Sequence, residues 1–463
     1  MQDHAFELTP QGRNRLADYN HARPFANFFP AVAGLYGIPY WVMFTNRGQC
    51  ISSFGLRNRA QGMLNFSAAN EAYRDTSRLG FRTFLKVAAG GQKHLYEPFA
   101  DSPANREMGC TNELGFDPAS LEITETNAQL GIAVEASFQT VPGEAFGGLL
   151  RRVTVTNTGS APATLEWVDG LPWVTCYGID WLTAKLMPYT SKATILLRGV
   201  EAGRPYFQLW GRTADRPGVE HMTRGNFALH YDAQGLLPAI VDPQAVFGPE
   251  TGFAHPAAFA DTDAFEVPDR QRQQNDIPCA MTFLRVSLPP QQKKTLWAVF
   301  GQDEGEDRLK TIAERVTGPD WYEEKTEQNR GIMRSICDRA ATFSAEPVFD
   351  GYCRCTFLDN VLRGGLPITL PDRSGRRRTY HVFSRKHGDM EREYNDFAVE
   401  PEFWSQGNGG YRDVLQNRRN DVYINVDSGL EIIRAFTSML RLDGFNPHGL
   451  EGSEFYLADA SEA

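Results

Sequence analysis

The chain has 463 residues, which is about three domains at roughly 150 residues per domain, so a single small binding module is excluded. Apolar residues make up 41%, aromatic residues 12% and charged residues 22%, a composition that can bury large cores and that a disordered chain would lack. The formal net charge of -10 argues against an extended nucleic-acid-binding surface, which would have to be basic. We therefore expect a globular chain with small or neutral ligands and no nucleic-acid partner.

The seven cysteines are scattered and form no paired CxxC motif, which argues against a disulfide framework or a zinc site. The opening MQDHAFELTP has none of the features of a signal peptide. Residues 24–44 carry no charge and have the length of a membrane span, but Pro24, Pro30 and Pro39 argue against a helix there. The sequence predicts a cytoplasmic protein without a membrane partner, with residues 24–44 forming a buried strand and loop.

Residues 24–302 are dominated by alternation of apolar and polar residues and by turn residues, a pattern typical of half-buried antiparallel strands. The segment GIAVEASFQTV is a clear example, because its apolar residues fall at every second position. Many short strands without helical spacing between them favour a large sandwich. We expect residues 1–302 to form an antiparallel β-sandwich domain.

Two segments of this region predict strand pairs joined by turns. In RRVTVTNTGSAPATLEWV, Val153 and Val155 alternate with threonines, NTGSAPA has turn chemistry, and Leu165 and Trp167 begin the next strand. This order predicts a β-hairpin. A second pair of strands is expected over residues 281–301, with two prolines at its turn.

After residue 302 the spacing of apolar residues becomes that of helices. A first helix is expected near 305–316, where Gly318 and Pro319 then stop it. A second is expected over 320–345, and a third from near Asp427 to Gly444. The sequence therefore predicts a helical linker over residues 303–346 and an all-α region over residues 347–463.

The densest group of candidate functional residues lies in HVFSRKHGDMEREYNDFAVEPEFWSQGNGGYRDVLQNRRND, residues 381–421. The GNGG loop would let the backbone approach a ligand closely, or it is a plain tight turn. Trp404 and Tyr411 could stack on a sugar ring, or they could lie in the core. His381 and His387, six residues apart, do not have the spacing of metal ligands, so we expect no metal.

Arginines at the end of this run add planar donors suited to phosphate or carboxylate groups. They are Arg412, Arg418 and Arg419. Pairing with Asp413 and Asp421 is the structural alternative. A phosphate-binding P-loop, a GxSxG motif and an HExxH motif are all missing from the sequence, which argues against nucleotide hydrolysis, serine esterase and zinc protease chemistry.

The run SRKHGDMEREYNDFAVEPEFWSQGNGGYRDVLQNRRNDV resembles the large β-glucan oligosaccharide phosphorylases, relatives of cellobiose phosphorylase in glycoside hydrolase family 94 and its neighbouring families. Within that group it is most similar to the phosphorylases of β-1,2-linked oligoglucans. PYWVMFTNRGQCISSFG, RRVTVTNTGSAPATLEW and PCAMTFLRVSLPPQQKKTLWAVFG resemble the β-sandwich of the same group. The resemblance implies an N-terminal sandwich, linker helices and an (α/α)6 barrel, with residues 347–463 as the first part of that barrel.

In the cellobiose phosphorylase pattern, an RDxxQD run lines the subsite for the transferred glucosyl unit. Arg412, Asp413 and Gln416 match this run. Asn417 stands at the place of the second aspartate and Asp421 follows four residues later, so either could take that role. The resemblance thus implies substrate binding by Arg412, Asp413, Gln416, Asn417, Asp421, Trp404 and Tyr411, and phosphate binding by Arg418 and Arg419.

The implied reaction is inverting phosphorolysis of β-linked glucose oligosaccharides to glucose 1-phosphate, with inorganic phosphate as co-substrate and no cofactor. The family's general acid lies in a motif further along, which implies an acid beyond Ala463, with Asp421 as the fallback. A barrel of about twelve helices takes roughly 200 residues or more. We therefore expect this chain to carry part of the site and to need a C-terminal half or a homodimer partner.

Two other functions are compatible with these residues. One is a β-glucan transglycosylase of related fold, and the other is a non-catalytic carbohydrate-binding protein. A requirement for phosphate separates the phosphorylase from both.

Overall fold

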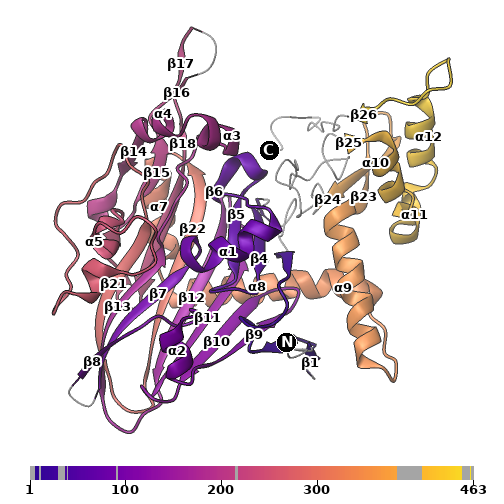
Figure 1. Cartoon of the computed structure of the whole chain (residues 1–463). Helices are drawn as coiled ribbons and strands as arrows, with labels where there is room; N and C mark the ends of the chain where they lie inside the picture. The colour runs from indigo at the N-terminus through magenta and orange to yellow at the C-terminus, as the bar shows by residue number, and fades with distance from the viewer. Residues whose placement is uncertain are drawn as a thin grey trace.

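The computed structural model describes residues 6–9, 12–29, 37–38, 40–89, 92–213, 217–382, 409–450 and 459. Figure 1 shows a large β-rich part, which contains the N-terminal strands, and a smaller C-terminal part with the last helices. Within the described ranges, none of the helices is both long and apolar enough to cross a membrane.

The largest sheet has eleven strands, paired antiparallel throughout. In spatial order they are β1 (Glu7–Leu8), β2 (Asn14–Ala17), β9 (Thr111–Phe116), β10 (Leu121–Asn127), β11 (Ile132–Thr140), β12 (Gly147–Asn157), β22 (Lys293–Glu304), β18 (Arg224–Asp232), β15 (Tyr206–Leu209) and β14 (Ile195–Arg198), with β19 (Gly235–Leu236) beside β18. The predicted alternation is confirmed in β11, where Ile132, Val134, Ala136 and Phe138 all lie in the core.

Two smaller antiparallel sheets face this one. The five-stranded sheet contains β20 (Ala239–Ile240), β21 (Ala280–Leu288), β13 (Ala163–Leu171), β7 (Arg82–Ala89) and β8 (Gln92–Tyr96), and the four-stranded sheet contains β3 (Ala26–Phe29), β4 (Tyr40–Thr45), β5 (Ile51–Leu56) and β6 (Gly62–Leu64). Side chains from all three sheets share one core. The predicted antiparallel sandwich is therefore confirmed, and β4 is the buried strand expected within residues 24–44.

Short helices and one small hairpin lie in the connections between the strands of the sandwich. They are α1 (Ala69–Leu79), α2 (Pro103–Glu107), α3 (Trp181–Leu186), α4 (Pro188–Ala193), α5 (Gln244–Phe247), α6 (Ala257–Ala260) and the strands β16 (Arg212–Thr213) and β17 (Val219–Glu220). In Figure 1, α3, α4 and the β16–β17 hairpin lie at one end of the sandwich.

The predicted hairpin at 153–167 is wrong. β12 pairs with β11 and β22 in the large sheet, whereas β13 pairs with β7 and β21 in the five-stranded sheet. The second predicted strand pair, over residues 281–301, is also not a hairpin. Pro289 and Pro290 lie in the connection from β21 to β22, and these strands belong to different sheets. Alternation shows which face of a strand is buried, but two inward faces can lie side by side or opposite each other. Here Val153 and Trp167 enter the same core from opposite sheets.

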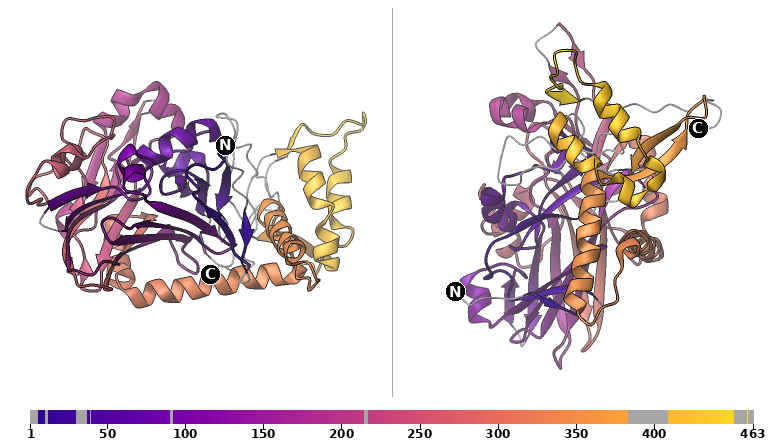
Figure 2. Two further views of the ribbon diagram at one scale, coloured as in Figure 1. Left: turned by 60° about the horizontal axis from the view of Figure 1, so that its bottom comes forward. Right: turned by 90° about the vertical axis from the view of Figure 1, so that its right-hand side faces the viewer.

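Helices α7 (Glu306–Val316) and α8 (Pro319–Cys337) follow the sandwich, close to the predicted positions, and α9 (Pro347–Gly364) comes next, where no separate helix was predicted. The start of α8 covers the outer face of the large sheet, where Gln139 Nε2 donates to Thr326 Oγ1 at 2.5 Å. Further along α8, Ile336 packs with Leu358 of α9. Figure 2 shows α8 running along the sheet and ending beside α9.

The prediction that residues 347–463 are all helical is wrong. The described part contains the hairpin β23 (Leu366–Pro371) and β24 (Arg377–Val382), the short strands β25 (Gly409–Gly410) and β26 (Gly449–Leu450), and the helices α10 (Tyr411–Arg418), α11 (Asp421–Ile424) and α12 (Glu431–Ser438). The Asp372 carboxylate accepts the backbone N–H groups of Ser374 and Arg376, each at 2.9 Å, which makes the tight turn between β23 and β24. The described elements do not form an (α/α)6 ring.

A buried ion pair connects the sheets at the centre of the sandwich. Arg151 on β12 forms two contacts with the carboxylate of Asp169 on β13, and both side chains are 0% exposed. Thr83 on β7 donates to Asp169 at 2.6 Å, and Arg151 donates to Gln49 Oε1 at 2.6 Å. The Arg151 guanidinium also lies over the Phe81 ring, 4.9 Å from its centre. These contacts satisfy most of the polar groups that the sandwich encloses here.

We predict that Asp169→Asn lowers the free energy of unfolding by about 3–5 kcal/mol, because it leaves the buried Arg151 charge without its partner. The matched control is Glu135→Gln, which removes the partly exposed partner of Arg152 at 2.8 Å and should change stability by no more than about 1 kcal/mol. Urea unfolding measures both variants. Equal losses for the two would contradict the central role of the buried pair.

Candidate functional site

Helix α10 carries most of the predicted site residues, and it has two different faces. Arg412 and Gln416, four residues apart, are exposed, and Arg419 continues the same face just after the helix. Tyr411 and Arg418, seven residues apart, are buried on another face of the helix. This is the spacing of an amphipathic helix. The helix therefore presents the polar end groups of Arg412, Gln416 and Arg419 together at the surface.

Of the two aromatic residues expected to stack on a sugar, Tyr411 is a core residue. Its hydroxyl donates to the backbone carbonyl of Phe436 on α12 at 2.8 Å, and the two rings meet edge to face with centres 5.1 Å apart. Trp404 lies outside the described residues, and so do the side chains of Asp413 and Asn417. Tyr411 thus holds α10 on α12 rather than offering a ring to a ligand.

A compact buried cluster brings together two predicted site residues, Arg418 and Asp421, with His381. His381 Nε2 donates to Asp421 Oδ2 at 2.8 Å, and Arg418 Nη1 lies 3.6 Å from Asp421 Oδ1. All three side chains are at most 3% exposed. The cluster joins β24 to the turn between α10 and α11. It therefore fixes the direction in which the exposed face of α10 points.

Burial determines the charge state of this cluster. It lowers the pKa of His381 to about 4, and the nearby Arg418 charge acts in the same direction, whereas the hydrogen bond to Asp421 acts against it. Burial also lowers the pKa of Arg418 to about 10, against the attraction of Asp421. At neutral pH the imidazole is therefore a neutral donor and the guanidinium is the positive charge.

Arg418 has more donors than partners. Its distance to Asp421 is too long for a hydrogen bond, and among the described residues none of its three guanidinium nitrogens has a hydrogen-bond partner. A guanidinium carries five N–H groups in a fork that suits an oxyanion. Chemically the cluster could hold an anion if solvent reached it. In the observed conformation the cluster is shielded from solvent, and its contacts connect β24, α10 and α11.

Asp421 was predicted as a substrate ligand and fallback acid, and Arg418 as a phosphate ligand. The structure places both in one cluster, and their roles stay predictions. His381 was weighed only as a metal ligand, and its pairing with Asp421 was missed. The alternation in β24, where Thr379 and His381 are both buried, is the signal that could have found it. In the part of the chain that the structure describes, His, Cys, Asp and Glu do not gather in a group able to hold a metal.

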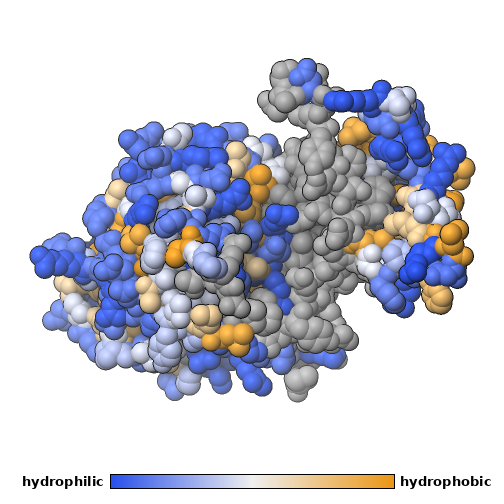
Figure 3. All heavy atoms as spheres, turned by 90° about the horizontal axis from the view of Figure 1, so that it is seen from above, coloured by the Kyte–Doolittle hydropathy of each residue, from blue (hydrophilic) through white to orange (hydrophobic). Residues whose placement is uncertain are grey.

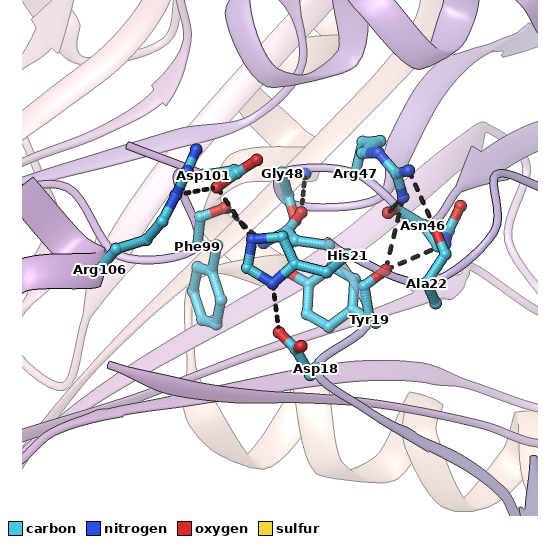
Figure 4. Close-up of polar contacts among 11 residues, drawn as sticks. Asp18, Tyr19, His21, Ala22, Asn46, Arg47, Gly48, Phe99, Asp101 and Arg106 are labelled. Carbon is cyan, nitrogen blue, oxygen red and sulfur yellow. Dashed lines mark hydrogen bonds and ion pairs between the residues drawn. The ribbon is translucent and has the colours of Figure 1, made fainter. Parts of the chain in front are cut away.

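A second polar cluster lies at the surface of the sandwich (Figure 4). His21 contacts Asp18 at 2.6 Å through Nδ1 and Asp101 at 3.2 Å through Nε2, and Asp101 accepts from Arg106 at 3.0 Å. The hydrogen bond to Asp18 raises the pKa of His21. The alternating charges satisfy one another, and the imidazole is 43% exposed. We therefore regard this cluster as structural, because it connects the turn after β2 to α2.

Comparison with known proteins gives no family assignment. No protein-family model matches the chain, and no curated protein matches it. Among solved structures, a bacterial glucoamylase complexed with acarbose is 8% identical with a TM-score of 0.40, over 93% of this chain and 55% of its own. A polysaccharide lyase is 12% identical with a TM-score of 0.32, over 63% and 34%. A kojibiose phosphorylase candidate from the human microbiome is 8% identical with a TM-score of 0.30, over 95% and 50%.

These likenesses are too distant to support an argument about this chain's activity. The chain spans about a third of the length of the lyase and about half of the other two.

We predict that His381 makes the protein sensitive to acid. Folded His381 stays neutral down to about pH 4, whereas an unfolded histidine takes up a proton near pH 6.5, so the stability is complete above 6.5 and is lost as the pH falls towards 4. At about 1.36 kcal/mol per pH unit the loss is at most roughly 3 kcal/mol. Urea unfolding of wild type and His381→Asn across this range should show their stability difference shrinking as the pH falls. A difference independent of pH would show that folding does not change the pKa of His381.

Proposed function

We propose that this chain binds β-linked glucose oligosaccharides and inorganic phosphate, and that it takes part in inverting phosphorolysis to glucose 1-phosphate. The observation that carries the proposal is the exposed face of α10, where Arg412, Gln416 and Arg419 lie together. These residues belong to the run RDVLQNRR, which resembles the glucosyl subsite of the β-glucan oligosaccharide phosphorylases. Guanidinium and amide groups side by side suit a ligand that combines hydroxyls with phosphate oxygens.

The proposed reaction explains this mixture of groups. A protonated carboxyl group gives its proton to the glycosidic oxygen, the bond from that oxygen to the anomeric carbon breaks, and a phosphate oxygen attacks the same carbon from the opposite face. Phosphate is already a nucleophile, so no base is needed to activate water. The protein's task is then to hold the phosphate dianion in line with the sugar. In this proposal Arg412 and Gln416 contact sugar hydroxyls and Arg419 contacts phosphate.

The general acid in this proposal lies elsewhere than in the buried cluster. A general acid has to touch the glycosidic oxygen, and the Asp421 side chain is 3% exposed and contacts His381 and Arg418. We assign to Asp421 the support of α10, and the acid to a group outside the described residues or on a partner. The β-1,2 linkage is part of the proposal on the resemblance alone, so an assay should compare β-1,2-, β-1,3- and β-1,4-linked oligosaccharides.

We predict that Arg412→Ala weakens oligosaccharide or phosphate binding by about 1.5–3 kcal/mol, which is the usual effect of losing a charged hydrogen bond. The matched control is Arg434→Ala, which removes another exposed arginine, on α12, and should leave both affinities unchanged. Calorimetric titration with each oligosaccharide, with and without phosphate, measures the effect. Affinities of Arg412→Ala equal to wild type for both ligands would remove Arg412 from the site.

We also predict that the chain associates and has little phosphorolytic activity by itself. In the last helical region Phe436 is buried against Tyr411, but Leu430, Ile433 and Leu440 are exposed by 60%, 58% and 48%. Figure 3 shows apolar residues on the surface of this C-terminal part. Such a patch marks an interaction surface, which a C-terminal half or a partner chain would cover.

Sedimentation velocity should show concentration-dependent association of the wild type, and Ile433→Ser should reduce it. Purified monomer that produces glucose 1-phosphate at ordinary enzyme rates would show that the chain already contains the whole site, including the acid.

A further inference from the structure

One end of the sandwich carries an unusual concentration of exposed apolar side chains. Seven large apolar residues are exposed in the described part of residues 1–304, and only Phe6 and Leu236 lie elsewhere. The other five are Leu186, Met187, Tyr189, Trp210 and Val219. We call these five residues the aromatic platform. They come from α3, α4, the β16–β17 hairpin and the segments beside them, which lie at one end of the sandwich in Figure 1.

The backbone under the aromatic platform is held in place by contacts between its segments. The backbone N–H of Trp210 donates to the backbone carbonyl of Thr194, the residue after α4, at 2.9 Å. Arg212 donates to Asp180 at 2.7 Å, and the same carboxylate caps the start of α3 through the N–H of Thr183 at 2.7 Å. The helix pair and the hairpin are therefore tied together, so a ligand would meet a largely prearranged surface.

The two aromatic rings of the platform face solvent. Tyr189 is 87% exposed and Trp210 is 47% exposed. The Trp210 ring has the imidazole of His221 as a neighbour, with ring centres 6.3 Å apart. Thr190, beside Tyr189, is exposed as well. Flat apolar rings thus stand next to hydroxyl and imidazole groups that can form hydrogen bonds. In Figure 3, which views the molecule from above, hydrophobic and hydrophilic residues lie side by side on this end of the molecule.

Three basic side chains near the platform are paired with carboxylates of this chain. Lys192 contacts Asp276 at 2.6 Å, Arg212 contacts Asp180, and Arg224 lies 3.7 Å from Glu304. The charges of these three basic groups are therefore neutralised within the chain. Such a surface favours an uncharged ligand over a phosphate, a nucleic acid or an acidic peptide.

We propose that the aromatic platform is a binding site for a neutral oligosaccharide, with Tyr189 and Trp210 stacking on its sugar rings. A pyranose has an apolar C–H face and a rim of hydroxyls, which matches rings bordered by Thr190 and His221. The site is separate from the α10 face. The identity of the ligand as a β-linked glucose oligosaccharide rests on the proposed function. The platform would bind a part of the same glucan that is distant from the bond to be cleaved.

The test is calorimetric titration of the full chain with β-1,2-, β-1,3- and β-1,4-linked glucose oligosaccharides in phosphate-free buffer. Tyr189→Ala and Trp210→Ala should each lower the affinity for at least one of them about tenfold, which is about 1.4 kcal/mol. The matched control is Tyr423→Ala on α11, since Tyr423 is 86% exposed but lies in the C-terminal part, and it should bind as wild type does. Circular dichroism of each variant checks that the fold is intact.

Sugar affinity that is unchanged in both folded variants, or no sugar binding by the wild type, would overturn the platform. Self-association that both substitutions abolish, without an effect on sugar binding, would instead make it a protein-binding surface. Arg412→Ala separates this inference from the proposed function, because it should leave phosphate-free binding at the platform intact. Loss of sugar binding in Tyr189→Ala, with the effect of phosphate on sugar binding unchanged, would support the platform. This result would hold even if Arg412→Ala showed that the α10 face does not bind sugar or phosphate.

Discussion

The ion pair between Arg151 and Asp169 is the constraint on which the rest of the structure depends. Both charges are removed from water, so they are tolerated only if they meet each other and their hydrogen-bonding neighbours. Side chains alternate along a strand, and a slip of one residue in β12 or β13 would turn one of the two charges away from the core. The pair thus allows only one register for the two strands. Through Gln49 and Thr83 it also fixes the segment before β5 and strand β7.

The position of the candidate site follows from this register. With β11 and β12 fixed, the side chain of Gln139 is placed on the outer face, where α8 binds it. The far end of α8 packs in the cluster that includes Leu366 of β23. The neighbouring strand β24 carries His381, which holds Asp421 and with it the turn after α10. The orientation of the exposed α10 face is therefore determined by a sequence of contacts that begins in the sandwich.

The sequence predicted what depends on local spacing and failed on what depends on distant partners. The inward residues of β11 and the buried strand in the uncharged stretch were predicted correctly, because alternation reports burial directly. The predicted pairing of β12 with β13 was wrong, because two strands show the same alternation whether they lie in one sheet or in two facing sheets. The β23–β24 hairpin was overlooked because its turn depends on a single aspartate, Asp372. Tyr411 was read as a possible ligand-stacking residue, and only the position of Phe436 on α12 shows that it belongs to the core.

The inverting phosphorolysis that we propose for this chain is tested most directly by the configuration of the product. Prolonged incubation of concentrated protein with a β-linked glucose oligosaccharide and phosphate, followed by nuclear magnetic resonance, identifies the product and its anomeric form. Attack by phosphate from the face opposite the leaving group turns a β-linkage into an α-phosphate. We expect α-glucose 1-phosphate, formed slowly and only when phosphate is present. Free glucose or a longer glucan formed equally well without phosphate would contradict it.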